Sequence, residues 1–195
     1  LLNPDARVLR GCLGQLKSAL DGDATLGAVS PLQYWDTSRK WMLPPAWLPT
    51  GPGMAALEQA WRSGRWASQL SLAYRQHAIA AWTGKEIPVG QRALSGGAMM
   101  VRRSALPAGE NLFDPSFFMY YEDSDLSLRL RRYGKKLALI RGAAALHEWE
   151  NAPGKAPLME ASKSIYLEKH FRDLRHWQTR RERLTARRPP LENPL

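Results

Sequence analysis

The chain has 195 residues, of which 44% are apolar and 24% charged, and its 28 Lys and Arg exceed its 18 Asp and Glu to give a net charge of +10. This composition is typical of a globular protein and excludes wholesale disorder and collagen-like chains. The chain has no run of about 18 apolar residues, the length that a membrane-spanning helix needs. Its single cysteine excludes an intramolecular disulfide and is typical of a reducing cytoplasm. The length corresponds to one domain or part of one.

The first predicted elements alternate between helix and strand. Apolar residues recur at helical spacing over residues 6–20 and predict an amphipathic helix, which ends at the turn-forming run Asp21-Gly22-Asp23. Residues 26–30 are a short apolar run before Pro31 and predict a buried strand. Together with the strand-like start of the chain, this order is typical of a βαβ sheet, so we predict the α/β fold class.

Residues 33–66 are rich in proline and tryptophan and predict an excursion from the sheet. Helical spacing predicts helices over residues 54–62 and 66–82. Five of the eight tryptophans lie between Trp35 and Trp66. Three interpretations stay open for them: packing in a core, a surface that stacks on sugars, and a belt at a membrane interface.

The second half of the chain contains the remaining predicted elements. A strand over residues 94–101 is entered through two glycines, which serve either the close approach of a ligand or a bulge. A turn at Asp114-Pro115 precedes a helix that starts in the acidic run 122–125 and ends before Gly134. The last predictions are two short strands over 137–140 and 143–146 and a helix over 157–177.

The positive charge is concentrated at the C-terminal end. Residues 163–195 contain nine Lys and Arg against four acidic residues, which is half of the net charge in about a sixth of the chain. Such a segment, above all the basic tail at residues 178–195, attracts phosphate groups of nucleotides, nucleic acids or anionic lipids. A solvated tail without a ligand explains the same composition equally well.

Three carboxylates, those of Glu122, Asp123 and Asp125, lie within four residues at a predicted helix start. One interpretation is structural: Asp123 or Ser124 caps the helix, and the acids complement the helix dipole. The other is catalytic, because like charges raise one another's pKa. A carboxylate tuned in this way suits a general base that deprotonates a hydroxyl.

Asp5 and His147 each end a predicted strand, at the edge where open α/β sheets bind ligands. If the two side chains meet there, they can share a hard divalent cation whose open positions bind phosphate oxygens. The alternative is a loop aspartate that caps the following helix and an unrelated surface histidine.

Several motifs follow one another in a distinctive order: LNPD at residues 2–5, SGGAMMVRR at 95–103, FDPSFFMYYEDSDL at 113–126, then Arg129-Leu130, Tyr133-Gly134 and His147. In this order, over residues 1 to about 177, the chain resembles glycosyltransferase family 2, the inverting enzymes of the GT-A type. The resemblance is strongest to its rhamnosyltransferase-like members. The motif around the acidic run is the most specific one.

The resemblance implies a GT-A (nucleotide-diphospho-sugar transferase) fold, which is Rossmann-like with a mixed sheet. It also implies that the strands that bind the nucleotide should precede Leu1. We therefore expect residues 1–177 to be the C-terminal, metal- and acceptor-side part of one larger domain. A sheet cut at this point exposes an edge that another segment or a partner chain must cover.

The resemblance also implies roles for individual residues. Asp5, in the position of the family's Asp-x-Asp motif, and His147 would bind Mn²⁺ or Mg²⁺ at the donor diphosphate. Asp123 would be the base that activates the acceptor hydroxyl, with Glu122 beside it orienting the acceptor. Further donor or acceptor contacts would come from Asn3, Gly96, Gly97, Asp125 and Trp149. Asn3 stands where many relatives have Asp, which weakens any contact made by that position.

The implied function is metal-dependent transfer of a sugar, such as rhamnose from dTDP-rhamnose, to a hydroxyl of a polysaccharide or lipid-linked glycan, with inversion. Such an enzyme would build bacterial cell-envelope polysaccharides. We expect it in the cytoplasm, peripheral on the inner face of the cell membrane, with oligomerisation open.

Two other classes of protein are alternatives to a glycosyltransferase. A non-catalytic basic module would bind nucleic acid or anionic membrane, but its basic and aromatic residues should then be interleaved, whereas here they are separate in sequence. No nucleic acid partner is therefore expected. A glycoside hydrolase needs two carboxylates on either side of a bond, which neighbours at one helix start supply poorly.

Overall fold

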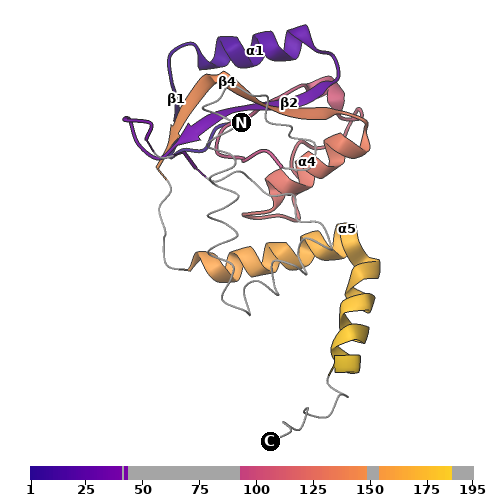
Figure 1. Ribbon diagram of the computed structural model, residues 1–195. Helices are drawn as coiled ribbons and strands as arrows, with labels where there is room; N and C mark the ends of the chain where they lie inside the picture. The colour runs from indigo at the N-terminus through magenta and orange to yellow at the C-terminus, as the bar shows by residue number, and fades with distance from the viewer. Residues whose placement is uncertain (41, 44–92, 149–153, 186–195) are drawn as a thin grey trace, which may run out of the picture.

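The computed structural model describes the backbone of residues 1–40, 42–43, 93–148 and 154–185, and the side chains of these residues up to 171. Figure 1 shows these segments as a coloured ribbon. The predicted helices over 54–62 and 66–82 and Trp149 lie outside the described residues. Most of the tryptophan-rich segment and the last ten residues also lie outside them.

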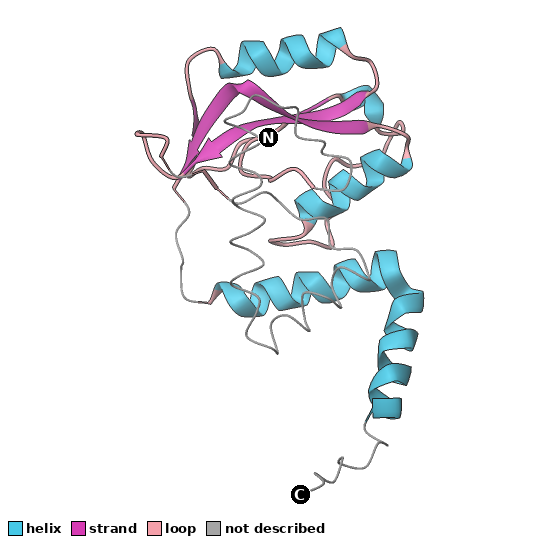
Figure 2. Ribbon diagram, viewed as in Figure 1, coloured by secondary structure: helices cyan, strands magenta, loops and turns pink. Residues whose placement is uncertain are grey.

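A four-stranded mixed sheet forms the centre of the described fold, in the order β1-β4-β2-β3. The central pair, β2 and β4, is parallel, and each outer strand is antiparallel to its neighbour. The mixed sheet with flanking helices confirms the predicted α/β class (Figure 2). The strands are β1 (Ala6–Val8), β2 (Leu26–Tyr34), β3 (Met100–Val101) and β4 (Lys136–His147).

Two helices cover the sheet on opposite faces, α1 (Cys12–Gly22) on one side and α4 (Glu122–Arg132) on the other (Figure 1). Side chains alternate along the central strands, as the period of a strand requires. Val29 therefore packs with Leu16 of α1, and its neighbour Ala28 packs with Leu126 of α4. The result is one hydrophobic cluster on each face of the sheet.

The helix predicted over residues 6–20 starts too early, because residues 6–8 form strand β1. Ala6 lies opposite His147 in an antiparallel pairing, and the Leu9 N–H donates to the Ala144 carbonyl. Pairing with β4 stabilises residues 6–8 as a strand more than their local spacing of apolar residues favours a helix. The helix begins only after Gly11, whose φ of 79° is accessible to glycine at little cost.

The strand predicted over residues 26–30 does not end at Pro31 but continues to Tyr34. The two strands predicted over 137–140 and 143–146 are likewise one strand, β4. Both differences have one cause: Pro31 pairs with Ile140 and the next residue, Leu32, pairs with Ala144, so β4 bulges between them. A bulge is where a strand tolerates a proline, which has no N–H to donate to a ladder.

The strand predicted over 94–101 is short in the structure, with an isolated bridge between Leu2 and Ala98 followed by β3. A single 3₁₀ turn, η2 (Arg103–Ala105), follows it. The acidic helix is confirmed as α4, and Gly134 follows it with a φ of 74°, as a helix end requires. Its N-cap position is Tyr121, however, so neither of the predicted capping residues caps it.

The last helix, α5 (Lys155–Thr185), starts two residues before the predicted range of 157–177 and ends eight residues after it. Its backbone is kinked at Phe171, where the direction of the ribbon changes in Figure 1. The N-terminal half packs below α4 through Tyr166, which is fully buried with its ring 5.4 Å from that of Tyr121. Among the described residues, no helix is both long and apolar enough to cross a membrane.

Leu126→Ala should destabilise the protein by about 2–5 kcal/mol, because this side chain is fully buried between α4 and the sheet. Leu13→Ala on α1 is the matched control, since that leucine is 56% exposed and should change the free energy of unfolding by less than about 0.5 kcal/mol. Urea unfolding followed by circular dichroism measures both. Equal losses in the two variants would contradict the assignment of this core.

Candidate functional site

The antiparallel pairing of β1 with β4 brings Asp5 and His147 together at one end of the sheet. Ala6 lies opposite His147, so Asp5 is the residue that precedes the pair. The distance between Asp5 Oδ1 and His147 Nε2 is 3.3 Å. The Asp5 side chain is half exposed and the histidine is largely buried. The solvent-accessible carboxylate of Asp5 thus lies next to the largely buried imidazole ring of His147.

The second ring nitrogen of His147 contacts Gln33, a residue that the sequence analysis did not single out. His147 Nδ1 lies 3.2 Å from Gln33 Oε1, and both residues are buried. Gln33 belongs to the part of β2 beyond Pro31, where the prediction had ended the strand. A longer predicted strand would have placed Gln33 near the same sheet edge as His147.

The two glycines at 96 and 97 lie between the two groups of candidate residues. The Gly96 N–H donates to Asp123 Oδ2 at 2.9 Å. A Cβ atom at Gly97 would lie 2.5 Å from both Gln33 Oε1 and His147 Nδ1, so a side chain there would collide with the histidine and its partner. The backbone of Asn3 also reaches this segment, because its N–H donates to the Gly97 carbonyl. Two adjacent residues therefore join the acidic helix start to the Asp5–His147 pair.

Asp123 is held at the start of α4 by backbone groups. Its Oδ2 accepts from Gly96, and its Oδ1 accepts from the Ser124 N–H at 2.6 Å. Burial raises the pKa of Asp123, and these hydrogen bonds oppose the increase only in part. The carboxylate is thus oriented by fixed donors and remains a stronger base than an ordinary aspartate, which is what a general base needs.

Glu122 lies beside Asp123, and few favourable interactions offset the burial of its carboxylate as well. Burial raises the pKa of Glu122, and the neighbouring charge of Asp123 raises it further. Its Oε2 atom is buried and has no hydrogen-bond partner among the described residues. A buried carboxyl oxygen without a partner is costly, so this atom is suited to accept a hydrogen bond from a bound hydroxyl.

The backbone just before these two acids is strained. Tyr120 and Tyr121 have φ values of 69° and 64°, in the left-handed region that residues other than glycine rarely adopt. Such a conformation costs roughly 1–2 kcal/mol per residue. Packing of the Tyr121 ring against Tyr166 of α5 holds it in place. The surrounding contacts thus hold a backbone conformation at the acidic helix start that the residues would not adopt by preference.

The donor set at Asp5 and His147 fits a divalent cation that is shared with phosphate oxygens. The described residues contain no group of three or more His, Cys, Asp or Glu side chains that could hold a metal ion. The Asp5 carboxylate, together with substrate phosphates and water, is a donor set that Mg²⁺ or Mn²⁺ accepts, and the His147 nitrogen is a ligand better suited to a transition-metal ion such as Mn²⁺ than to Mg²⁺. Adjacent ligand atoms around such an octahedral ion lie roughly 3 Å apart, close to the separation of Asp5 Oδ1 and His147 Nε2.

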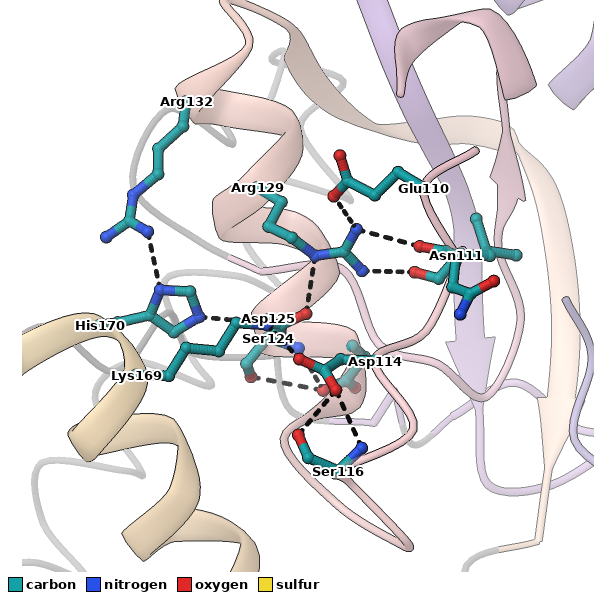
Figure 3. A network of polar contacts seen from close by, with 12 residues as sticks. Glu110, Asn111, Asp114, Ser116, Ser124, Asp125, Arg129, Arg132, Lys169 and His170 are labelled. Atoms are coloured by element: carbon teal, nitrogen blue, oxygen red, sulfur yellow. Dashed lines mark hydrogen bonds and ion pairs between the residues drawn. The ribbon is translucent and has the colours of Figure 1, made fainter. Parts of the chain in front are cut away.

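Asp125, predicted to contact donor or acceptor, lies elsewhere. It is fully buried, and Figure 3 shows its carboxylate facing α5 and Arg129. Arg129 Nε approaches Oδ2 at 2.7 Å, and Lys169 Nζ and His170 Nε2 each approach Oδ1 at 2.7 Å. Both oxygens are therefore occupied by side chains of the protein, and Asp125 joins α4 to α5.

Further contacts extend this network, which neither composition nor spacing indicated. Arg129 also binds Glu110 at 2.6 Å, and Lys169 also binds Asp114 (Figure 3). The partners Lys169 and His170 come from α5, more than forty residues away along the chain. Only the tertiary fold could show that they meet Asp125.

Asp125 should make the stability of the protein fall in acid. Burial raises the pKa of Asp125, but hydrogen bonds from His170, Lys169 and Arg129 outweigh burial and lower it overall. A carboxyl with a lowered pKa stabilises the fold above the unfolded-state value of about 3.9, and this contribution is lost as the pH falls through that value and below it.

Asp125→Asn should therefore lower the free energy of unfolding at pH 7 by about 3–5 kcal/mol, because it leaves buried positive charges without their partner. The variant should also lose less stability than the wild type between pH 6 and pH 3. Asp21→Asn, at an exposed carboxylate on α1, is the control and should keep the wild-type acid dependence. Parallel stability curves for Asp125→Asn and wild type would contradict this role.

No protein-family model matches the chain. The chain is similar to two proteins named N-acetylglucosaminyl-diphospho-decaprenol L-rhamnosyltransferase, from two strains of Mycobacterium tuberculosis. Each is 32% identical over 174 residues, which is 85% of this chain and 52% of the relative. The chain thus spans about half the length of the curated relatives it matches. Over that length it is homologous to rhamnosyltransferases, which confirms its resemblance to the rhamnosyltransferase-like glycosyltransferases of family 2.

Proposed function

We propose that the chain is the metal- and acceptor-side part of an inverting glycosyltransferase of the GT-A type. The observation that carries this proposal is the position of Gly96 and Gly97, which contact Asp123 on one side and His147 on the other. The proposed base and the proposed metal-binding pair are thus both packed against the same two adjacent residues, which holds them at one place in the fold. Displacement of a nucleoside diphosphate needs these two functions on opposite sides of the reacting carbon.

In this proposal Asp123 removes the proton of the acceptor hydroxyl as the hydroxyl oxygen attacks the anomeric carbon. The bond to the donor diphosphate breaks on the opposite side, so the configuration at that carbon is inverted. Its raised pKa lets Asp123 accept the proton, while the N–H groups of Gly96 and Ser124 keep the carboxylate in place. Glu122 orients the acceptor through its unpartnered oxygen.

Asp5 and His147 would hold Mn²⁺ or Mg²⁺ at the leaving group. The cation would supply positive charge that neutralises the departing diphosphate. Asp5 provides the charged oxygen ligand and His147 the nitrogen ligand, from atoms that already face each other. The backbone of Asn3 supports this edge by its hydrogen bond to Gly97.

The names of the relatives indicate the substrates. They describe transfer of L-rhamnose to a decaprenol-linked N-acetylglucosaminyl diphosphate. We therefore propose an L-rhamnosyl nucleotide such as dTDP-rhamnose as donor and a polyprenyl-diphosphate-linked glycan as acceptor, in the synthesis of a cell-envelope polysaccharide. Such an acceptor would bring the protein to the inner face of the cell membrane, where the basic tail would meet anionic lipid headgroups.

Asp123→Asn should lower the rate of sugar transfer by about 10²–10⁴-fold, the range that a general base contributes. Asp21→Asn is the control and should transfer at the wild-type rate, because its exposed side chain lies on α1. The acid limb of the wild-type kcat/KM profile should lie above the ordinary aspartate pKa of about 3.9, in the direction that burial shifts this group. Wild-type transfer by Asp123→Asn would refute the assignment of the base.

Asp5→Asn should weaken Mn²⁺ binding by at least about tenfold, since it removes the only charged ligand of the proposed pair. Titration of Mn²⁺ followed by electron paramagnetic resonance, with and without a nucleoside diphosphate, measures this affinity. Asp36→Asn serves as the matched control, because Asp36 bonds only to Ser38 among the described side chains. Salt-sensitive binding to oligonucleotides or anionic vesicles, with no effect of Mn²⁺, would instead favour a non-catalytic basic module.

A further inference from the structure

We infer that Gln33 is a positioning residue that sets the tautomer of His147, so that the Nε2 lone pair of the ring faces Asp5. The inference deepens the proposed function and rests on it, because the orientation matters for holding a cation.

The orientation of the Gln33 amide follows from its partners in the strand and in the glycine segment. Gln33 Nε2 lies 3.5 Å from the Ala98 carbonyl oxygen and 3.4 Å from Ser30 Oγ. A carbonyl oxygen only accepts, and the Ser30 hydroxyl already donates to that same carbonyl at 2.7 Å. Both neighbours therefore need a donor from Gln33, so the NH₂ group points toward them and Oε1 points toward the histidine.

This orientation determines which ring nitrogen of His147 carries hydrogen. Gln33 Oε1 can only accept, so His147 Nδ1, at 3.2 Å, must donate. In a neutral imidazole the other nitrogen, Nε2, then has the lone pair. Nε2 is the atom that lies 3.3 Å from Asp5 Oδ1. Two acceptors at this distance repel each other unless a proton or a metal ion lies between them.

Among the described residues, Gln33 Oε1 is the group within hydrogen-bond distance of His147 Nδ1. Gln33 is 7% exposed and His147 9% exposed, so bulk water does not reach the contact freely. A Cβ atom at position 97 would lie 2.5 Å from each of the two bonded atoms. The absence of a side chain at Gly97 is thus a condition for the bond. Partners of this kind, which fix a ligating histidine from behind, commonly affect metal affinity by about 10–100-fold.

Gln33→Leu and Gln33→Glu separate a positioning role from a merely structural one. Leucine cannot accept a hydrogen bond, whereas the glutamate carboxylate accepts the Nδ1 hydrogen as the amide does and loses only the long contacts that the NH₂ group makes to Ser30 and Ala98. Long-range ¹H–¹⁵N spectra of the metal-free protein, at a pH where the ring is neutral, report which nitrogen is protonated. We expect the Nδ1–H form in wild type and Gln33→Glu, and a mixture or the Nε2–H form in Gln33→Leu.

Mn²⁺ affinity is the second measurement. It should fall by about 10–100-fold in Gln33→Leu and return to within a few-fold of wild type in Gln33→Glu. Urea unfolding of each variant checks that it is folded, and Gln33→Met, which keeps the length of the side chain, replaces the leucine variant if that one is not. An unchanged tautomer, or an unchanged Mn²⁺ affinity in a folded variant, overturns the inference.

Failure of the proposed function would look different. In that case wild type and Asp5→Asn would bind Mn²⁺ equally, or Asp123→Asn would transfer sugar at the wild-type rate. The first of these results would also remove the metal-binding part of the inference about Gln33. The tautomer spectra alone would then decide whether Gln33 orients the ring of His147.

Discussion

The parallel pairing of β2 with β4 is the interaction on which the rest of the described fold depends. It is the central pair of the sheet, and both helical layers pack against it. Because parallel strands end at the same sheet edge, Gln33 near the end of β2 lies beside His147 at the end of β4. The antiparallel strand β1 then adds Asp5 to this edge. The proposed metal site is therefore a consequence of strand register.

Asp123 and Asp125 lie in the first turn of the same helix, but their pKa values are shifted in opposite directions. Asp125 has a lowered pKa because Lys169, His170 and Arg129 surround it. Asp123, two residues earlier, has a raised pKa because burial is opposed only by hydrogen bonds from uncharged groups. One carboxylate thus attaches α5 to α4, and the other is the proposed base. The proposed chemistry depends on this difference in partners, since the residue type is the same.

The position of Gly97 connects the proposed function with the inference about Gln33. A residue with a side chain there would displace both His147 and the amide that holds it. The same segment donates the Gly96 N–H to the proposed base. Geometry at the metal pair and geometry at the base are therefore coupled through two adjacent residues. The chain is homologous to rhamnosyltransferases, and substitutions at Asp123 and at Asp5 test the proposed base and the proposed metal pair separately.

The α/β class, the acidic helix α4 with its end at Gly134, and the resemblance to glycosyltransferase family 2 could all be predicted from the sequence alone. These depend on local patterns, namely spacing, a left-handed glycine and contiguous motifs. Three other features became visible only in the folded chain: residues 6–8 are a strand, β2 continues through Pro31, and Asp125 binds side chains of α5. Each of these results depends on a contact with a residue distant in the chain, either a strand pairing or a buried ion pair. The free energy of such a contact exceeds the local secondary-structure propensity.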